Sequence, residues 1–243
     1  SFVKMTEQIY RQSIAEKELT LQMLRSQINP HFLYNTLDNM RMASIRAGYT
    51  RLATMCELLA RILRYGVTDP NHLVTVREEL EYLDEYIQLI KLRYSDINIY
   101  TCIDPSIEHY QIIKLLLQPL VENSITHGIE RDSSNGSIQI WGYQKEQKLV
   151  FTVSDNGNGM SQEQLELLRD YLDDRNTEFK SIGLKNIKKR VQLYYGEEAD
   201  FAIDSKQYQG TTVTVTIPLT ISSEASDIKE RNNHDRHLHF NRR

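Results

Sequence analysis

Residues 153–160 read Val-Ser-Asp-Asn-Gly-Asn-Gly-Met. The apolar run at 149–153 predicts a strand, which would deliver Asp155 into a loop where Gly157 and Gly159 allow a ligand to approach the backbone closely. A carboxylate in that place can accept a hydrogen bond from the exocyclic amine of adenine. The same residues are also typical of a plain hairpin turn. Taken alone, the segment leaves a binding loop and a structural turn both open.

Glycine and proline are distributed unevenly on either side of this loop. Before Pro70 the chain contains only Pro30, Gly48 and Gly66, whereas seven of its ten glycines follow Asp132. The first part therefore predicts long helices, and the second predicts an α/β domain with tight turns. Because the helices and strands expected in the second part mix without regular βαβ alternation, we expect an α+β sandwich there.

The first 70 residues predict a helical hairpin. Apolar residues recur every three or four positions over residues 2–40 and again over 52–63, and residues 47–50 form a turn between the two stretches. A hairpin with a single apolar stripe on each helix cannot bury itself fully. Dimerisation into a four-helix bundle is the expected solution.

Residues 27–35, Gln-Ile-Asn-Pro-His-Phe-Leu-Tyr-Asn, are the first stretch that could carry chemistry. Pro30 either begins a helix or kinks a longer one, so the backbone departs from a regular continuous helix one residue before His31. At about 100° per residue, His31 lies about 200° from Leu33 and points away from the apolar stripe, and Asn35 shares its face. An exposed neutral imidazole is a competent nucleophile near neutral pH. A plain surface histidine is the alternative.

Residues 112–127 predict a strongly apolar helix that ends at Gly128. It is interrupted by Glu122, Asn123 and His127, of which the last two are four apart and share a face. An amide oxygen suits Mg²⁺, and a histidine can contact phosphate. The alternative is a buried helix whose last turn is polar.

Two segments near the C-terminal end complete the set. Residues 181–186 open a basic helix that extends to Arg190, and the free N–H groups at the start of a helix can bind phosphate. A solvated basic face is the alternative. Residues 209–212 lead into the last predicted strand. Residues 222–243 are polar and without periodicity, which is typical of a disordered tail.

The composition excludes several classes of protein. The 243 residues include 29 basic and 33 acidic side chains, for a net charge of −4, which excludes a protein built mainly to coat nucleic acid. Two cysteines, Cys56 and Cys102, cannot make a disulfide framework or a four-cysteine zinc site. The P-loop pattern GxxxxGK[ST] is absent. No apolar run reaches the roughly 20 residues that a membrane-spanning helix needs.

Taken in order, these segments resemble one family. Over roughly residues 20–218 the chain resembles the cytoplasmic part of sensor histidine kinases of the LytS/YesM-like group. NPHFLYN is similar to the phospho-acceptor box of that group, and LLLQPLVENSITHG to its N box. VSDNGNGM and SIGLKNIKKR are similar to its two glycine boxes, and QGTTVTVTIP to its closing strand. Five motifs in this order and spacing are far more specific than any one of them.

The resemblance implies a dimeric helical bundle that carries the acceptor, followed by a Bergerat-type ATP-binding sandwich. It divides the chain into a dimerisation and phospho-acceptor domain at 1–70, with an incoming signalling helix at 1–20. A connecting helix at 71–93 could belong to the ATP domain, which would occupy 94–219. The tail then begins at 220.

The resemblance also implies a role for each matched residue. His31 would take the γ-phosphoryl group of ATP, Asn123 would hold Mg²⁺, and Asp155 would bind the adenine amine. Phosphates would lie near two of the remaining nucleotide-binding residues, His127 and Lys185, and Gly183 would be the hinge of a lid over the nucleotide. The full remaining set is His127, Gly157, Gly159, Gly183, Leu184, Lys185, Asn186 and Thr211.

Three positions bear on mechanism, and two of them depart from the family pattern. In many histidine kinases an acidic residue follows the acceptor, and this chain has Phe32 there. We hypothesise that Glu122, beside the expected Mg²⁺ site, takes the base or orienting role instead. Asn35 stands where related families place a residue that orients water for dephosphorylation. The lid contains Phe-Lys-Ser at 179–181 in place of further glycine, which predicts a stiffer lid.

The leading hypothesis is an ATP-dependent protein-histidine kinase that passes phosphate to an aspartate on the receiver domain of a response regulator. One alternative is a mechanical ATPase similar to gyrase or MutL, although such ATPases carry no helical hairpin with an acceptor box. Another is a signalling scaffold that dimerises and binds nucleotide without transferring phosphate. The leading hypothesis predicts the cytoplasmic portion of a membrane receptor, beginning just inside the membrane.

Overall fold

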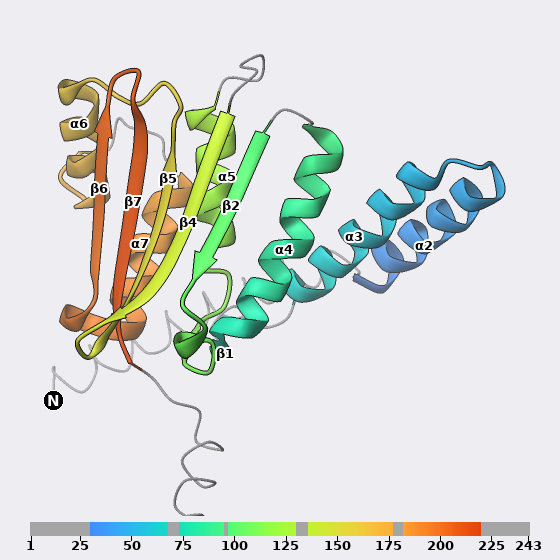
Figure 1. Cartoon of the computed structure of the whole chain (residues 1–243), viewed down its shortest axis with the longest axis horizontal. Coiled ribbons are helices and arrows are strands. Elements are labelled where there is room, and N and C mark those ends of the chain that lie inside the picture. The colour runs from blue at the N-terminus through green and yellow to red at the C-terminus, as the bar shows by residue number, and fades with distance from the viewer. Residues whose placement is uncertain (1–29, 68–72, 95–96, 130–135, 177–181, 220–243) are drawn as a thin grey trace, which may run out of the picture. The chain divides into compact units, whose positions relative to one another are not determined.

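The computed structural model describes residues 30–67, 73–94, 97–129, 136–176 and 182–219 (Figure 1). The chain divides into two compact units, residues 1–67 and 68–243. The expected signalling helix at 1–20, the lid segment at 179–181 and the tail from 220 lie outside the described residues. None of the described helices is both long enough and apolar enough to cross a membrane.

In the described part of the first unit, residues 30–67, α2 (Pro30–Arg46) and α3 (Thr50–Val67) form a helical hairpin. Helix α2 ends at a turn in which Gly48 adopts a φ of +76°, a left-handed conformation that glycine adopts without steric cost. The backbone N–H of Tyr49 closes the turn on the carbonyl oxygen of Ser44 at 2.8 Å. The sequence prediction of a helical hairpin with a turn near residue 48 is therefore confirmed.

The hairpin buries little apolar surface by itself. Ala53, Cys56 and Leu58 are buried. The apolar stripe expected over residues 52–63 is partly wrong, because Leu52 and Leu59, which it contained, are exposed, whereas Ala53 and Leu58, which it omitted, are buried. Many large apolar side chains remain exposed, namely Phe32, Met40, Met42, Ile45, Tyr49, Leu52 and Leu59. Exposed apolar surface of this extent is typical of surfaces that contact other proteins.

The second unit is built on a five-stranded mixed sheet with the order β2-β4-β5-β7-β6. Strand β2 pairs in parallel with β4, and the other neighbours are antiparallel. The strands are β2 (Ile97–Ile103), β4 (Gly136–Lys145), β5 (Lys148–Asp155), β6 (Asp200–Lys206) and β7 (Gly210–Pro218). A separate two-stranded ribbon pairs β1 (Leu73–Thr75) with β3 (Gln111–Ile113).

Helices cover one face of the sheet (Figure 1). They are α4 (Val76–Arg93), α5 (Gln118–Asn123), the π-helical turn η2 (Ser124–Gly128), α6 (Gln162–Leu172) and α7 (Ile182–Tyr195), with short 3₁₀ turns η1 (Pro105–Ile107) and η3 (Gly196–Glu198). One core contains side chains from both layers, among them Leu83, Leu120, Ile140, Phe151 and Val191. On the other face of β4, Trp141 and Tyr143 are exposed. The expected α+β sandwich is confirmed.

The helix expected at 112–127 is wrong over its first half. Strand β3 occupies residues 111–113, a turn follows at 114–117, and α5 begins only at Gln118. The reason is local geometry, because Leu115 adopts a φ of +57°, which is incompatible with a continuous right-handed helix. Apolar content alone does not reveal such a turn.

Candidate functional site

Asp155 stands at the end of β5 with its carboxylate buried, at 6% exposure. One carboxylate oxygen, Oδ1, accepts hydrogen bonds from the backbone N–H groups of Gly157 at 3.0 Å and Thr211 at 3.2 Å. Burial raises the pKa of this carboxyl above its usual range, while hydrogen bonds from Gly157, the Ser124 side chain and Thr211 act in the opposite direction. Asp155 is therefore held in one place by three separate parts of the chain.

The loop after Asp155 packs against the end of η2 without room for side chains. A β-carbon on Gly157 would lie 1.7 Å from the carbonyl oxygen of Gly128, and one on Gly128 would lie 2.6 Å from Cγ of Asp155. The backbone N–H of Asn158 donates to the same Gly128 oxygen at 2.9 Å. The end of the N box and the first glycine box thus form one continuous surface.

The last strand closes this surface from the other side. Gly159 and Gly210 adopt φ values of +58° and +94°, and a β-carbon on Gly210 would lie 1.8 Å from the carbonyl oxygen of Asp155. Thr211 is buried, and its hydroxyl lies 2.9 Å from the hydroxyl of Ser205. The sequence pointed to Gly159 and Thr211, but it gave no sign of Ser205, which is a single serine near the end of β6.

The three N-box residues that the sequence singled out, Glu122, Asn123 and His127, lie on α5 and η2. Glu122 and His127 are exposed and Asn123 is half-buried. The turn is π-helical, with the N–H of Ile129 donating to the Ser124 oxygen five residues earlier at 3.0 Å, and such turns are frequent at functional sites. The Asn123 side chain makes no capping hydrogen bond to η2. Its amide oxygen is thus not committed to holding that turn.

The charge of Glu122 raises the pKa of two tyrosines on α4. Burial is the main cause that raises the pKa of Tyr86, and the Glu122 carboxylate raises it further. Tyr82 responds in the same direction, again mainly through burial, with Glu79 and Glu122 among the contributing charges. The carboxylate of Glu122 therefore lies near the α4 face that adjoins α5.

The basic residues of α7 divide into two groups. Lys185 Nζ lies 2.7 Å from Oδ1 of Asp174 and 3.9 Å from the centre of the Tyr171 ring. Lys188 and Lys189 pair with Asp173 and Asp174 respectively. Arg190 points elsewhere and donates to the backbone carbonyls of Lys114 and Leu115. The basic residues of this helix suggested one cluster containing Lys185, Lys188, Lys189 and Arg190. That prediction is wrong for Arg190, which lies apart from the three lysines.

The remaining residues of the second glycine box differ in their surroundings. Gly183 is exposed, and a β-carbon there would meet open space. Leu184 is buried in the core at 2% exposure, and Asn186 is exposed. Of these three, only Leu184 has a packing role in the structure.

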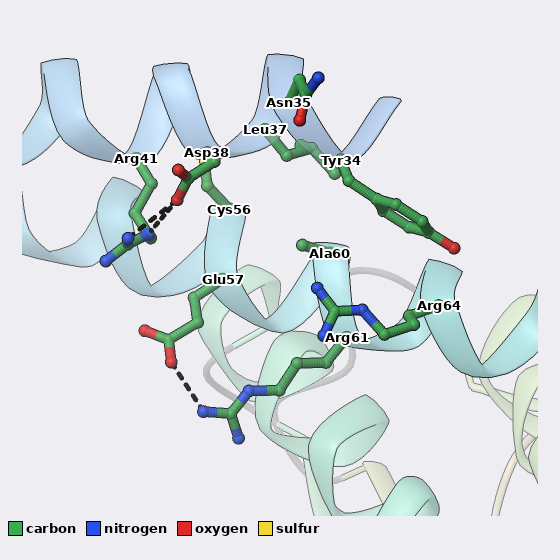
Figure 2. Close-up of a pocket in the computed structure, with 10 residues that line it drawn as sticks. All are labelled: Tyr34, Asn35, Leu37, Asp38, Arg41, Cys56, Glu57, Ala60, Arg61 and Arg64. Atoms are coloured by element: carbon green, nitrogen blue, oxygen red, sulfur yellow. Dashed lines mark hydrogen bonds and ion pairs between the residues drawn. The ribbon is translucent and has the colours of Figure 1, made fainter. Parts of the chain in front are cut away.

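In the first unit, His31 and Asn35 are exposed on α2, with His31 Nδ1 lying 3.2 Å from Asn35 Nδ2. Phe32 is 65% exposed and offers no carboxylate to the ring. Asn35 also borders a hollow of about 410 Å³ on the hairpin, which Figure 2 shows together with its lining residues. The ion pairs Asp38–Arg41 and Glu57–Arg61 cross its wall, and the Arg64 guanidinium lies 5.5 Å from the Tyr34 ring centre.

Sequence reasoning missed one strongly buried charge. Glu79, in the first turn of α4, is fully buried and accepts hydrogen bonds from the backbone of residues 115–117. The only sequence signal near it is the Thr75-x-x-Glu78 capping box. That signal explains the neighbouring glutamate and makes Glu79 look like an ordinary first-turn acid.

Two family models match the chain side by side. Residues 19–98 match the family described as histidine kinase. Residues 109–221 match the family described as histidine kinase-, DNA gyrase B-, and HSP90-like ATPase. The first match contains the acceptor box, and the second contains Asp155 and the residues that surround it.

Known proteins similar to the chain include the sensor protein kinase HptS of Staphylococcus aureus (strain USA300), which is 33% identical over 205 residues. The match covers 84% of this chain and 39% of that protein, so the chain spans about two fifths of the length of the curated relatives it matches. Similar solved structures include the histidine kinase domain of the Erythrobacter litoralis EL346 blue-light activated histidine kinase. Its TM-score is 0.48 at 17% identity, covering 78% of this chain and 94% of that one.

A second solved structure is the catalytic domain of histidine kinase ThkA, with a TM-score of 0.47 at 18% identity, covering 61% of this chain and 95% of that one. The two adjacent family matches and the relative that spans both agree with the order of the five sequence motifs. The chain therefore belongs to the sensor histidine kinases of the LytS-like type.

Proposed function

We propose that the chain is the catalytic region of a two-component sensor kinase, which transfers the γ-phosphoryl group of ATP to His31 and then passes it to an aspartate of a response regulator. The observation that carries the proposal is the buried Asp155 carboxylate, fixed by the N–H groups of Gly157 and Thr211. It lies in an ATPase-type domain on the same chain as an exposed histidine in an acceptor box.

Asp155 is suited to bind adenine. Its Oδ1 accepts two backbone N–H groups, which fixes the orientation of the carboxylate. A carboxylate can accept a hydrogen bond from the adenine amine, whereas guanine presents a carbonyl oxygen at the corresponding ring position and would be repelled. Gly157 and Gly159 let the loop pass close to the nucleotide, and Thr211 supports Asp155 from the last strand.

Phosphate binding would fall to the polar ends of the surrounding helices. Asn123 has an amide oxygen that suits Mg²⁺, and the described residues contain no cluster of three acidic, histidine or cysteine side chains that could hold a metal by themselves. We therefore expect the cation to be shared between Asn123 and phosphate oxygens, where it would neutralise charge on the triphosphate. His127, Lys185 and Asn186 would contact phosphate, with Gly183 and Leu184 at the base of the lid.

The chemical step would form a bond between a ring nitrogen of His31 and the γ-phosphorus, while the bond from that phosphorus to the β,γ-bridging oxygen breaks and ADP leaves. Asn35 Nδ2 is a donor and engages Nδ1 at 3.2 Å, which places the proton of the neutral ring on Nε2, so attack through Nε2 would require a base to accept that proton. Glu122 would orient the reacting groups or accept a proton, as the residue that replaces the missing acid at position 32. Asn35 would also orient water when phospho-His31 is hydrolysed.

The proposal includes an assembly and a location. The exposed apolar side chains of α2 and α3 would be buried in a homodimer, as a four-helix bundle. The receiver domain of a response regulator is the partner that accepts the phosphoryl group. The chain would be the cytoplasmic portion of a membrane receptor, where both ATP and such receiver domains are found.

Incubation with γ-labelled ATP tests the proposal. We expect acid-labile, base-stable label on the chain, lost in His31→Ala and retained in the control His109→Ala, an exposed histidine of the second unit that stacks on Tyr110. Label that persists in His31→Ala would overturn the assignment of the acceptor. ATP hydrolysis without label would indicate a mechanical ATPase, and ATP binding with neither would indicate a scaffold.

A further inference from the structure

Glu79 is a fully buried carboxylate at 0% exposure, in the first turn of α4. Its Oε2 accepts a hydrogen bond from the backbone N–H of Leu115 at 2.9 Å. Its Oε1 accepts from Leu116 at 2.8 Å and from Leu117 at 3.0 Å. Three consecutive N–H groups, all more than 30 residues away in sequence, therefore converge on one side chain. A buried carboxylate needs this number of donors to remain inside the protein.

The turn that Glu79 binds has an unfavourable backbone conformation. Leu115 lies in the left-handed region with a φ of +57°, which costs energy for a residue with a side chain. Helix α5 begins directly after the turn, and its N-cap residue, Leu117, makes no side-chain capping hydrogen bond. The three donors to Glu79 lie just before α5, so its carboxylate holds the turn that leads into this helix and places a negative charge at the end of the helix where one is favourable.

Arg190 holds the opposite side of the same turn. Its guanidinium donates to the carbonyl oxygens of Leu115, at 3.2 Å, and of Lys114. Burial lowers the pKa of Arg190, and the nearby Glu79 charge acts in the opposite direction. The N–H groups of the turn therefore meet an anion from α4, and its carbonyl groups meet a cation from α7.

Further hydrogen bonds tie the flanks of the turn to the same two helices. The hydroxyl of Tyr82, on α4, donates to Oε1 of Gln118 at 2.8 Å. The hydroxyl of Tyr195, at the end of α7, accepts the backbone N–H of Ile113 at 2.9 Å. The segment before the N box is consequently fixed on both sides of residues 114–117.

The position of the turn has a direct consequence for the nucleotide site. Helix α5 has only six residues and carries Glu122 and Asn123 at its end, and Ser124, the next residue, bonds to Asp155. A helix this short has little stability of its own. Its direction is therefore set by what holds its first turn.

We propose that Glu79 is a positioning residue for the ATP site: it holds the turn at 114–117 that leads into α5 and so fixes Asn123 and Glu122 relative to Asp155. With Arg190 it joins three elements at one point, namely α4, the N-box helix and α7, which begins with the second glycine box. The inference rests on the proposed function, because it assigns Glu79 a role in ATP binding.

The test is nucleotide binding by Glu79→Gln, measured with a fluorescent ATP analogue at saturating Mg²⁺. The amide keeps the shape of the side chain and one acceptor oxygen, but its NH₂ group would face a backbone N–H. We expect the Kd to rise about tenfold, the effect of one such hydrogen bond, at a temperature where circular dichroism shows the variant folded. The KM for ATP in His31 phosphorylation should rise in parallel. Glu81→Gln, an exposed carboxylate on the same helix, is the matched control and should bind as the parent does.

Hydrogen exchange separates positioning from general stability. In Glu79→Gln we expect the amides of residues 115–117 to exchange faster while those of the central strands keep their protection. If Glu79→Gln does not fold, Arg190→Gln tests the other side of the turn, and it should also weaken nucleotide binding. A folded Glu79→Gln or Arg190→Gln that binds with the parent Kd overturns the inference. A parent protein that binds no ATP overturns the proposed function instead.

Discussion

Gly128 lies so close to the Asp155 carboxylate that a β-carbon on residue 128 would sit 2.6 Å from Cγ of Asp155. The neighbouring Gly157 makes a still closer approach, because its β-carbon would fall 1.7 Å from the Gly128 carbonyl oxygen. That oxygen belongs to the backbone and cannot turn aside as a flexible side chain can. The N box and the first glycine box are therefore joined through atoms that leave no room for substitution.

Gly157→Ala should consequently destabilise the second unit. Relief of the overlap requires the backbone to shift, and overpacking of this kind typically costs about 1–3 kcal/mol. Urea unfolding followed by circular dichroism measures the free energy of unfolding. Gly183→Ala is the control, since its β-carbon would meet open space on a helix, where alanine is favoured by up to about 1 kcal/mol. Equal stability of Gly157→Ala and the parent would contradict the packing described above.

Asp155→Asn should separate stability from binding. The amide keeps an acceptor for Gly157 and Thr211 and removes the cost of a buried charge, so the free energy of unfolding at neutral pH should equal or exceed that of the parent. ATP affinity should fall roughly 10- to 100-fold, because the adenine amine loses its charged acceptor. Isothermal titration measures the affinity, with Asp200→Asn, an exposed strand residue, as the control. Unchanged affinity for ATP would remove Asp155 from the adenine site.

The pH dependence of stability follows from the raised pKa of Asp155. Below the ordinary aspartate pKa, the carboxyl is protonated in both folded and unfolded chains, and its burial costs nothing. As the pH rises through the ordinary pKa toward the higher folded-state pKa, ionisation favours the unfolded chain, and the parent loses stability. The stability advantage of Asp155→Asn should therefore be largest at neutral pH and should shrink on acidification. A difference that is independent of pH would show that Asp155 is not buried as described.

The sequence predicted Asp155 and its two glycines because a strand end, a carboxylate and two glycines stand together in one local motif, although Gly128 and Thr211 complete the surroundings of that loop. It could not predict Glu79, because the donors to its carboxylate lie at residues 115–117, and nothing in a helix start announces partners so distant. For the same reason the helix expected at 112–127 began too early. The left-handed Leu115 is stable only because α4 and α7 hold that turn.

The lysines of α7 illustrate a different limit of sequence reading. Their spacing after Gly183 suggested a phosphate site, and the structure adds that Asp173 and Asp174, at the end of α6, already pair with Lys188, Lys185 and Lys189. The charge pattern of α7 gives no information on these partners, because each aspartate precedes its lysine by more than ten residues. A role at phosphate would therefore require exchange of partners by Lys185.

Asp174→Asn should strengthen ATP binding if Lys185 contacts phosphate. The carboxylate of Asp174 pairs with Lys185 at 2.7 Å, and that pair must break before the ammonium group reaches a nucleotide. Since exposed ion pairs are weak, the expected gain in affinity is roughly two- to fivefold, and it should diminish at high salt. Asn tolerates the positive φ of residue 174. Asp170→Asn, whose carboxylate pairs with Arg175, should have no effect. Weaker binding by Asp174→Asn would instead assign the pair a structural role.

Asn35→Ala should slow phosphorylation of His31. The neutral imidazole carries one proton, and a partner at Nδ1, where Asn35 lies at 3.2 Å, favours one ring orientation and leaves Nε2 for the phosphoryl group. Loss of one such contact should reduce the initial rate by about three- to tenfold at saturating ATP. Asn39→Ala, an exposed amide on the same helix, should retain the parent rate.

Asn35→Asp distinguishes orientation of the ring from the role in hydrolysis. In the parent, the Nδ2 group of Asn35 donates to Nδ1, whereas a carboxylate would accept a hydrogen bond from Nδ1–H. Either contact orients the ring, so Asn35→Asp should recover most of the phosphorylation rate that Asn35→Ala loses. Neither a carboxylate nor alanine should orient the attacking water as the amide does. The decay of isolated phospho-His31 should therefore be slower in both variants than in the parent. Nuclear magnetic resonance identifies which ring nitrogen carries phosphate, and we expect Nε2 in all three proteins. Phosphate on Nδ1 in the parent would contradict the placement of Asn35, because that nitrogen faces the amide.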